Sequence, residues 1–242
     1  MGIEMLLIFG LVVIVFWFVL KTNNKNHKII QGKKGEEIVA RSLNFWLKRS
    51  NKTYVYNDIT LHTKRGTTQI DHLVLSRKGV FVIETKFLNG WIYGDEDSHH
   101  WTHINGLKQK NSIYNPLFQN HSHVRHVANT IHVSSNEITG IVTNVGNARL
   151  KGSINPLLGK PKILRGTGFV LGIYFSFGSR FTQDQVNQFR DKIEKAKLEQ
   201  SSEVNKAHIK YAKKFQRKGK TNLFPWAIVI LAVGFLAYKM MY

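Results

Sequence analysis

The sequence predicts an α/β domain built around a mixed sheet. Apolar residues first recur with helical spacing over residues 38–47, and strand-like runs rich in β-branched and aromatic residues follow. A second helical segment begins at Asn115-Pro116, and further strand candidates and a long last helix come after it. Helices that alternate with groups of strands are typical of one domain in which helices cover a sheet.

Local patterns set the expected elements. Gly35-Glu36-Glu37 opens the first helical pattern, and Thr182 with Gln185 forms a capping-box pattern that begins the last helix. The apolar face of that helix carries Val186, Phe189, Ile193 and Ala196, then Val204, Ala207, Tyr211 and Phe215. We expect strands at residues 53–60, 67–76, 80–87, 91–93, 138–145, 162–164 and 169–177.

Both ends of the chain have the composition of membrane spans. Residues 6–20 are apolar apart from Gly10, and with the five residues before them they reach the roughly 20 residues that a bilayer requires. Neither a positive stretch nor a small-residue cleavage site accompanies this run, which disfavours a cleaved signal peptide. Residues 223–238 carry no charge. The alternatives are a buried core helix at either end, or an interfacial helix at the second.

The basic residues beside these runs predict a topology. Lysines follow the first run, and seven more basic residues precede the second, so both basic flanks face the middle of the chain. The positive-inside rule then places a multi-pass protein with two spans in the cell membrane, with its soluble domain cytoplasmic and both termini outside. We therefore expect a transmembrane helix at 1–20, a polar tether at 21–31, a core at 32–135, additional strands of the same domain at 136–181, a long basic amphipathic helix at 182–222 and a transmembrane helix at 223–242.

Charge and composition limit the partners. Lys and Arg number 35 against 15 Asp and Glu, a formal charge of +20, which favours nucleic acid or anionic lipid as partner. The absence of cysteine excludes disulfides, thiolate metal sites and a cysteine nucleophile. One basic group has two readings, because it could contact anionic lipid headgroups beside the second span or follow a nucleic-acid backbone. It comprises Lys206, Lys210, Lys213, Lys214, Arg217, Lys218 and Lys220.

The chemistry is concentrated on two neighbouring strands. Asp71 lies inside an apolar strand, where an unpaired carboxylate is costly, and Glu84 and Lys86 share one face of the next strand. If Ser76 pairs with Gly79 across a two-residue turn, Asp71 falls directly opposite Glu84. Like charges there repel each other, and a hard divalent cation such as Mg²⁺ would turn that repulsion into a binding site.

Two alternatives remain open at this point. A three-residue turn ending at Gly79 would put Asp71 opposite Thr85 instead. Asp71 could also form an ion pair with a lysine, with Glu84 as a strand-end charge. Clustered ionisable groups on an apolar strand favour a functional site over a structural ion pair of this kind.

Several motifs occur in a fixed order between residues 32 and 132: Gly32-x-x-Gly35-Glu36, Gln69-Ile70-Asp71-His72, GVFVIETK at 79–86, Gly90, Trp101 and Asn115-Pro116-x-x-Gln119. On these motifs the chain resembles the nuclease-related domain (NERD) family, which is similar to the PD-(D/E)XK nuclease superfamily. The resemblance implies a PD-(D/E)XK nuclease-like mixed β-sheet core flanked by helices. The superfamily's proline before the aspartate is Ile70 here, which is usual for NERD.

The same resemblance implies roles for five residues. Asp71 and Glu84 would hold the metal, Mg²⁺ or Mn²⁺, and Lys86 would be the catalytic lysine. Glu36 would be the helix-borne acid and a further possible metal ligand, and Gln119 the polar residue of the following helix. The implied reaction is hydrolysis of phosphodiester bonds in DNA or RNA at the cytoplasmic face of the membrane.

Histidines surround the second helix. Gln119, His123 and His126 share one face by spacing, so a zinc site is possible. The competing carboxylate site favours phosphate-facing or exposed histidines instead. His72 follows Asp71 and points to the opposite face, so we expect it to be packed. Two alternatives to a nuclease are a catalytically silent nucleic-acid-binding module of the same fold and a membrane scaffold for protein partners.

Overall fold

The computed structural model describes residues 2–48, 52–63, 66–151 and 162–201. The chain divides into two compact units, and the larger one comprises Gln31–Glu203. This unit confirms the coarser part of the predicted fold class, a mixed α/β fold, because it combines mixed sheets with covering helices.

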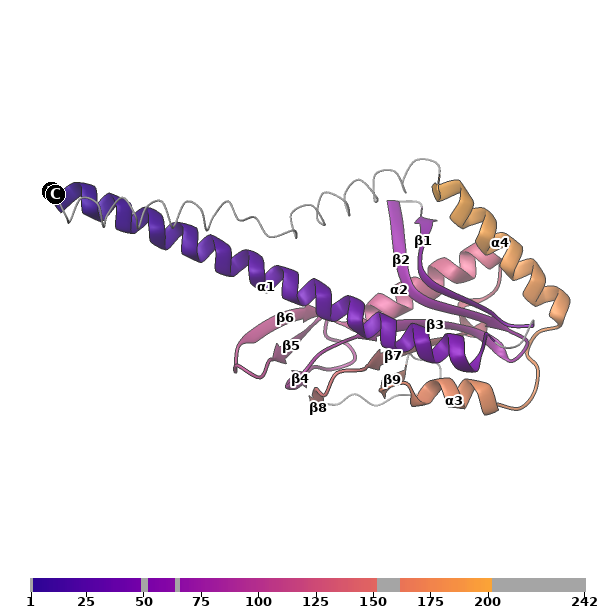
Figure 1. Cartoon of the computed structure of the whole chain (residues 1–242). Coiled ribbons are helices and arrows are strands. Elements are labelled where there is room, and N and C mark those ends of the chain that lie inside the picture. The colour runs from indigo at the N-terminus through magenta and orange to yellow at the C-terminus, as the bar shows by residue number, and fades with distance from the viewer. Residues whose placement is uncertain (1, 49–51, 64–65, 152–161, 202–242) are drawn as a thin grey trace. The chain divides into compact units, whose positions relative to one another are not determined.

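The main sheet has five strands in the order β1-β2-β3-β7-β9 (Figure 1). Strands β1, β2 and β3 pair antiparallel, whereas β7 and β9 extend the sheet in parallel. A parallel neighbour requires a crossover, and α2 lies within the connection from β3 to β7. The bounds are β1 (Tyr54–Thr63), β2 (Gly66–Ser76), β3 (Gly79–Lys86), β7 (Ile138–Asn144), β9 (Lys162–Arg165) and α2 (Pro116–Ile131).

A second sheet of four strands, in the order β6-β5-β4-β8, is formed mostly by the β3–α2 connection. Its inner residues pack with Leu117 of α2 and Val142 of β7 in a separate small core. The three strands of the connection are shorter than β1, β2 and β3, and the sequence had predicted the strand at Trp91. The bounds are β4 (Trp91–Tyr93), β5 (His100–Ile104), β6 (Lys110–Tyr114) and β8 (Arg149–Lys151).

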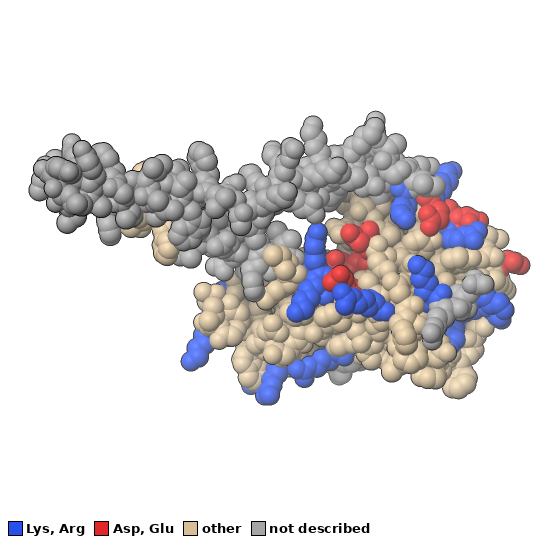
Figure 2. All heavy atoms as spheres, viewed as in Figure 1, with Lys and Arg blue, Asp and Glu red and all other residues tan. Residues whose placement is uncertain are grey.

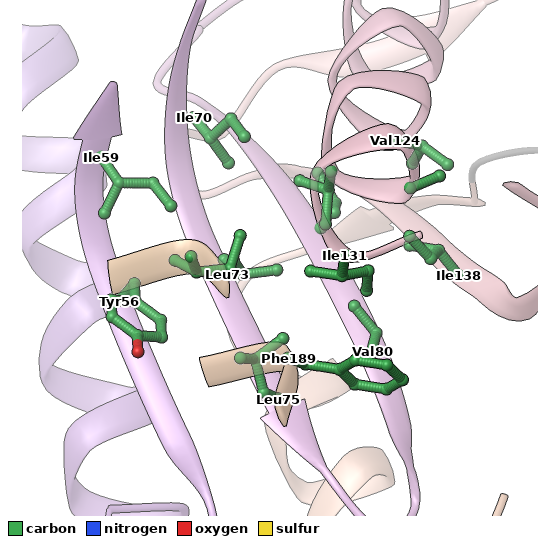
Figure 3. Packing of buried hydrophobic residues seen from close by; sticks show 14 of the residues in the cluster. Tyr56, Ile59, Ile70, Leu73, Leu75, Val80, Val124, Ile131, Ile138 and Phe189 are labelled. Carbon is green, nitrogen blue, oxygen red and sulfur yellow. The ribbon is translucent and has the colours of Figure 1, made fainter. Parts of the chain in front are cut away.

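Helices cover both faces of the main sheet. On one face, α2 and α4 (Gln183–Ser201) close a core with alternate residues of β1, β2 and β3, part of which Figure 3 shows. On the other face, Val39 and Leu43 of α1 (Gly2–Trp46) and Val170 of α3 (Gly168–Phe175) pack against Val74 and other residues of the sheet. A single-turn helix, η1 (Ser135–Glu137), precedes β7.

Two asparagines hold α2 in place. Asn115 caps the helix by accepting a hydrogen bond from the backbone N–H of Leu117, and its amide donates to carbonyls of the loop before β5. Asn120 is fully buried, and its amide donates to the carbonyls of Val82 on β3 (3.3 Å) and Ile141 on β7 (2.8 Å). The helix is thereby attached across two strands of the sheet, and its N-terminal face is fixed relative to the end of β3.

Most predicted elements are confirmed, and one is wrong. The capping box of α4 forms in both directions: Thr182 N–H donates to Gln185 Oε1 and Gln185 N–H donates to Thr182 Oγ1. Residues 169–177, expected as a strand, are mostly helix α3. Periodicity alone does not separate a short continuous apolar run from a buried helix. Phe169, Val170 and Ile173 are buried at helical spacing.

The expected membrane segments are not supported. Within the parts of the chain that the structure describes, no helix is long and apolar enough to cross a membrane. Residues 223–242 and the basic group at 206–220 lie outside the described residues, as does the continued apolar face from Val204. Residues 21–31, expected as a polar tether, are helical and continue α1. Polar residues such as Asn and Lys lower helix propensity by at most about 0.7 kcal/mol each, and no proline interrupts the run.

Replacing Asn120 by alanine should destabilise the domain, because it removes two buried hydrogen bonds to the carbonyls of Val82 and Ile141. We expect the free energy of unfolding to fall by about 1–3 kcal/mol. Urea unfolding monitored by tryptophan fluorescence measures this difference. The exposed Asn136→Ala variant is the matched control, and equal stability of the two variants would refute the anchoring role of Asn120.

Candidate active site

The β2–β3 hairpin brings the two predicted carboxylates together. Ser76 pairs with Gly79, so the turn has two residues, and the antiparallel pairs continue as far as His72 with Ile83. This is one of the two registers that the sequence left open, and its pairs end one position before Asp71 and Glu84. The alternative register, which places Asp71 opposite Thr85, is excluded.

The sheet is distorted at Asp71. The β1–β2 pairs run on both sides of Asp58 and Asp71 but omit these two residues, and Asp58 has a positive φ of 54°. Ile70 and Leu73 belong to the same buried core although they are three residues apart, so the apolar alternation shifts by one residue here. The carboxylate of Asp71 accepts a hydrogen bond from the backbone N–H of Thr85 at 2.7 Å and so holds β2 to β3 where the regular pairing stops.

Glu84 and Lys86 project from β3 toward α2. They continue the row of Val80 and Val82, which face α2 and α4. Lys86 Nζ donates to Glu84 Oε1 at 2.6 Å and to Gln119 Oε1 at 3.0 Å. Three of the predicted site residues are therefore in direct contact, on two elements that Asn120 ties together.

Glu84 is almost fully buried, with 1% of its surface exposed. Burial raises the pKa of its carboxyl group, but His123 and Lys86 outweigh burial and leave the pKa below its ordinary value. His123 Nδ1 lies 3.3 Å from Glu84 Oε2. That oxygen has no hydrogen-bond partner within the described part of the chain. The lowered pKa favours the ionised carboxylate, whose Oε2 lies beside His123 but accepts no hydrogen bond from the described residues.

Asp71 and Glu36 have the opposite tendency. Burial and the charge of Glu84 raise the pKa of Asp71 to about 8, and Glu36 adds to this effect. Burial and the charges of Asp58 and Glu84 likewise raise the pKa of Glu36. Among the described residues, Glu36 forms no hydrogen bond with Asp71, Glu84 or Lys86. It affects the site only through the electrostatic effect of its charge. The acids create a negative potential that favours protons or a bound cation.

The structure adds His123 to the site. The sequence placed His123 on one helical face with Gln119 but did not predict its contact with Glu84, because helical spacing does not specify which strand the helix faces. His121 is exposed. His72 is buried and pairs with Asn57 at 2.8 Å, and burial lowers its pKa to about 4, so it is packed as expected.

The donor set suits a hard divalent cation. Two carboxylates of neighbouring strands, one with an unsatisfied oxygen, provide the oxygen ligands that Mg²⁺ and Mn²⁺ prefer. No group of three or more His, Asp and Glu side chains among the described residues is placed to hold a metal ion. A metal would therefore rest on Asp71 and Glu84, and water or substrate oxygens would complete its coordination, as is common for Mg²⁺.

Close packing explains why glycine occupies position 35. A Cβ atom there would approach Phe87 Cβ to 2.9 Å, which is closer than two such atoms normally come. Gly35 therefore lets α1 pack directly on the residue after Lys86. This contact brings Glu36 toward the end of β3.

Comparison with known proteins identifies relatives of the part of the chain that contains this site. The profile of the nuclease-related domain family matches residues 31–145, a range that includes Glu36, Asp71, Glu84, Lys86 and Gln119. The chain is also similar to an uncharacterised protein of Bacillus anthracis, with 42% identity over 123 residues. That match covers 49% of this chain and 56% of the relative, so the chain spans little more than half the length of the relative. Residues 31–145 are therefore similar to the nuclease-related domain family.

The raised pKa of Asp71 gives a stability test. The pKa of Asp71 in the folded state, about 8, exceeds the ordinary value of 3.8. Between these two pH values, the native state keeps a proton on Asp71 that the unfolded state has released. Stability should therefore fall as pH rises from about 4 to 8. Asp71→Asn should reduce this fall, so that its melting temperature exceeds that of the wild type most clearly at pH 8–9. Each kcal/mol corresponds to about 2–4 °C in a domain of this size.

Thermal unfolding of both proteins across this pH range provides the measurement. The control is Asp97→Asn, which removes an exposed aspartate. Parallel pH curves for wild type and Asp71→Asn would mean that Asp71 is not buried beside other carboxylates.

Proposed function

We propose that this protein is a metal-dependent nuclease that hydrolyses phosphodiester bonds of DNA or RNA. The observation that carries the proposal is the contact of Lys86 with both Glu84 and Gln119 beside the Asp71 carboxylate. Two acids and a lysine at the end of adjacent strands form the arrangement that metal-assisted phosphoryl chemistry requires. The match to the nuclease-related domain supports the same reaction class.

Glu84 and Asp71 would have different roles because their pKa values differ. Glu84 stays ionised because His123 and Lys86 lower its pKa, so it is ready to act as an anionic ligand. Asp71 is poised to exchange its proton for a cation, since its pKa of about 8 reflects burial and the nearby negative charges. A Mg²⁺ or Mn²⁺ ion on these two residues would supply Lewis acidity toward the phosphate and lower the pKa of bound water.

Lys86 would stabilise the negative charge that develops on the phosphate. Its ammonium group is held by Glu84 and Gln119, so little reorganisation is needed when the substrate arrives. Gln119 positions the lysine from α2 without competing for charge. The formal charge of +20 would draw a polyanion to the surface. Lysine and arginine side chains are spread widely over the face in Figure 2, and acidic side chains gather in a few places.

A cleavage assay tests the proposal. The purified full chain is incubated with labelled single-stranded and duplex DNA and RNA in Mg²⁺, in Mn²⁺ and in EDTA. We expect cleavage that requires the metal, and rates reduced roughly 100-fold or more in Glu84→Gln and Lys86→Met, the loss typical when one electrostatic stabiliser is removed.

Two exposed variants serve as controls. Glu37→Gln and Lys195→Met change the same residue types outside the site and should cleave at the wild-type rate. Equal activity of Glu84→Gln and Glu37→Gln would refute the assigned site. Salt-dependent binding without cleavage by the folded wild type would indicate a nucleic-acid-binding module instead.

Attachment to a membrane is a separate proposal that rests on the sequence alone. The apolar runs at 6–20 and 223–238, with basic residues on their inner sides, support two spans around a cytoplasmic domain. In this arrangement the basic group at 206–220 would contact anionic lipid headgroups, each residue adding about 1 kcal/mol near the surface.

Fractionation of bacterial cells expressing the chain tests the attachment. We expect the full chain to remain in the membrane pellet after an alkaline carbonate wash, and a variant lacking residues 1–20 and 223–242 to be released. Terminal tags should be accessible from outside in intact cells. Release of the full chain by the wash, or protected tags, would overturn the proposed topology.

A further inference from the structure

A pocket of about 320 Å³ lies between the two sheets, directly beside the candidate site. Lys86 forms part of its wall, so the residue that contacts Glu84 and Gln119 also borders this space. Most of the lining is apolar and comes from both sheets, including Trp101 of β5, Val142 of β7 and Ile163 of β9. The volume is at the lower end of the range of small-ligand sites, roughly 300–1,000 Å³.

Cations surround this apolar space. Arg149 and Arg165 line it, and both also line a neighbouring pocket that contains Trp91. The Trp91 ring has Lys151 Nζ at 4.5 Å and the Arg149 guanidinium at 5.5 Å from its centre. The four strands of the second sheet and β9 contain no aspartate or glutamate. The opening of the apolar pocket is therefore bordered by an aromatic ring, Trp91, and by several cations.

This combination suits an unstacked nucleotide. A base is planar and largely apolar on its faces, and its phosphates need positive charge outside the pocket. Duplex bases remain stacked inside the helix and could not enter, whereas single-stranded bases can be splayed into protein pockets. The polar lining offers little for sequence readout, because Asn144 already accepts from Leu88 N–H and donates to the carbonyls of Leu88 and Gly146.

We propose that the substrate is single-stranded nucleic acid, bound with one base in this pocket and neighbouring phosphates on Arg149 and Arg165. Trp91 provides a stacking surface for a second base. The strand then passes Lys86 to reach Glu84 and Asp71. The inference rests on the proposed function in that Lys86 links the pocket to the reaction site. Binding should depend little on sequence, because the pocket wall has few free polar groups.

A binding experiment in EDTA tests this without any cleavage. Fluorescence anisotropy measures the affinity of the full chain for a labelled 12-mer oligothymidylate and for a duplex of equal length. We expect the single strand to bind at least 10-fold more tightly. Trp91→Ala and the double variant Arg149→Ala/Arg165→Ala should each weaken single-strand binding about 10-fold, in line with stacking contributions of roughly 1–3 kcal/mol per base.

Matched controls separate the pocket from the general charge of the protein. Phe177→Ala removes a fully exposed aromatic ring, and Lys48→Ala/Lys195→Ala removes two exposed cations. These variants should change the affinity less than 3-fold. The arginine double variant should also lower the salt dependence of binding, because two phosphate contacts on a single strand contribute a slope of about 1.4.

The results distinguish this inference from the proposed function. Equal affinity for single strand and duplex would overturn the inference even if the protein cleaves duplex. So would losses of affinity in Trp91→Ala and Arg149→Ala/Arg165→Ala that are no larger than those in the control variants. Selective single-strand binding that Glu84→Gln retains would support it even if no cleavage occurs.

Discussion

Glu84 sets the main constraint on this domain. A carboxylate that is 1% exposed loses most of its hydration, and an unpaired buried charge would cost several kcal/mol. Lys86 on the same strand and His123 on α2 provide the compensation. The helix must therefore lie against the end of β3, and the buried amide of Asn120 fixes it there. The charge of Glu84 and the structural hydrogen bonds of Asn120 thus require the same position of α2.

The second constraint is the end of the β2–β3 pairing. Regular hydrogen bonding stops after His72 and Ile83, and the Asp71 side chain bonds to the backbone of Thr85 in its place. One carboxylate thereby serves as part of the sheet and lies beside Glu84. The pKa values of the two acids shift in opposite directions, because His123 and Lys86 outweigh burial at Glu84, whereas burial and the charge of Glu84 raise the pKa of Asp71. A divalent cation would relieve the repulsion that the fold builds in here.

Local chemistry in the sequence predicted much of this arrangement. The two-residue turn between Ser76 and Gly79 determined the hairpin register and hence the meeting of Asp71 with Glu84. Reciprocal hydrogen bonds confirmed the start of α4 at Thr182. Residues 169–177 were misassigned because a uniformly apolar run has no period that separates strand from helix.

Long-range contacts escaped prediction. The role of His123 depends on which face α2 presents to β3, and tertiary packing decides this. Strands β6 and β8 went unrecognised because they are short, and β8 pairs with a strand far away in the chain. The distortion at Asp58 and Asp71 also lacks a local signal, since two non-glycine residues occupy it.

The second sheet gives a reason for the asymmetry of charge around the site. Asp71 and Glu84 lie on the β2–β3 side of Lys86, whereas Arg149, Lys151 and Arg165 lie on the side of the second sheet. A cation and a polyanion would thus approach Lys86 from opposite directions without competing for the same groups. Lys86 lies at the boundary of the two potentials, where the phosphate would meet the metal. Leu117 of α2 packs in the small core with residues of both sheets. One helix therefore fixes the position of the second sheet relative to the end of β3.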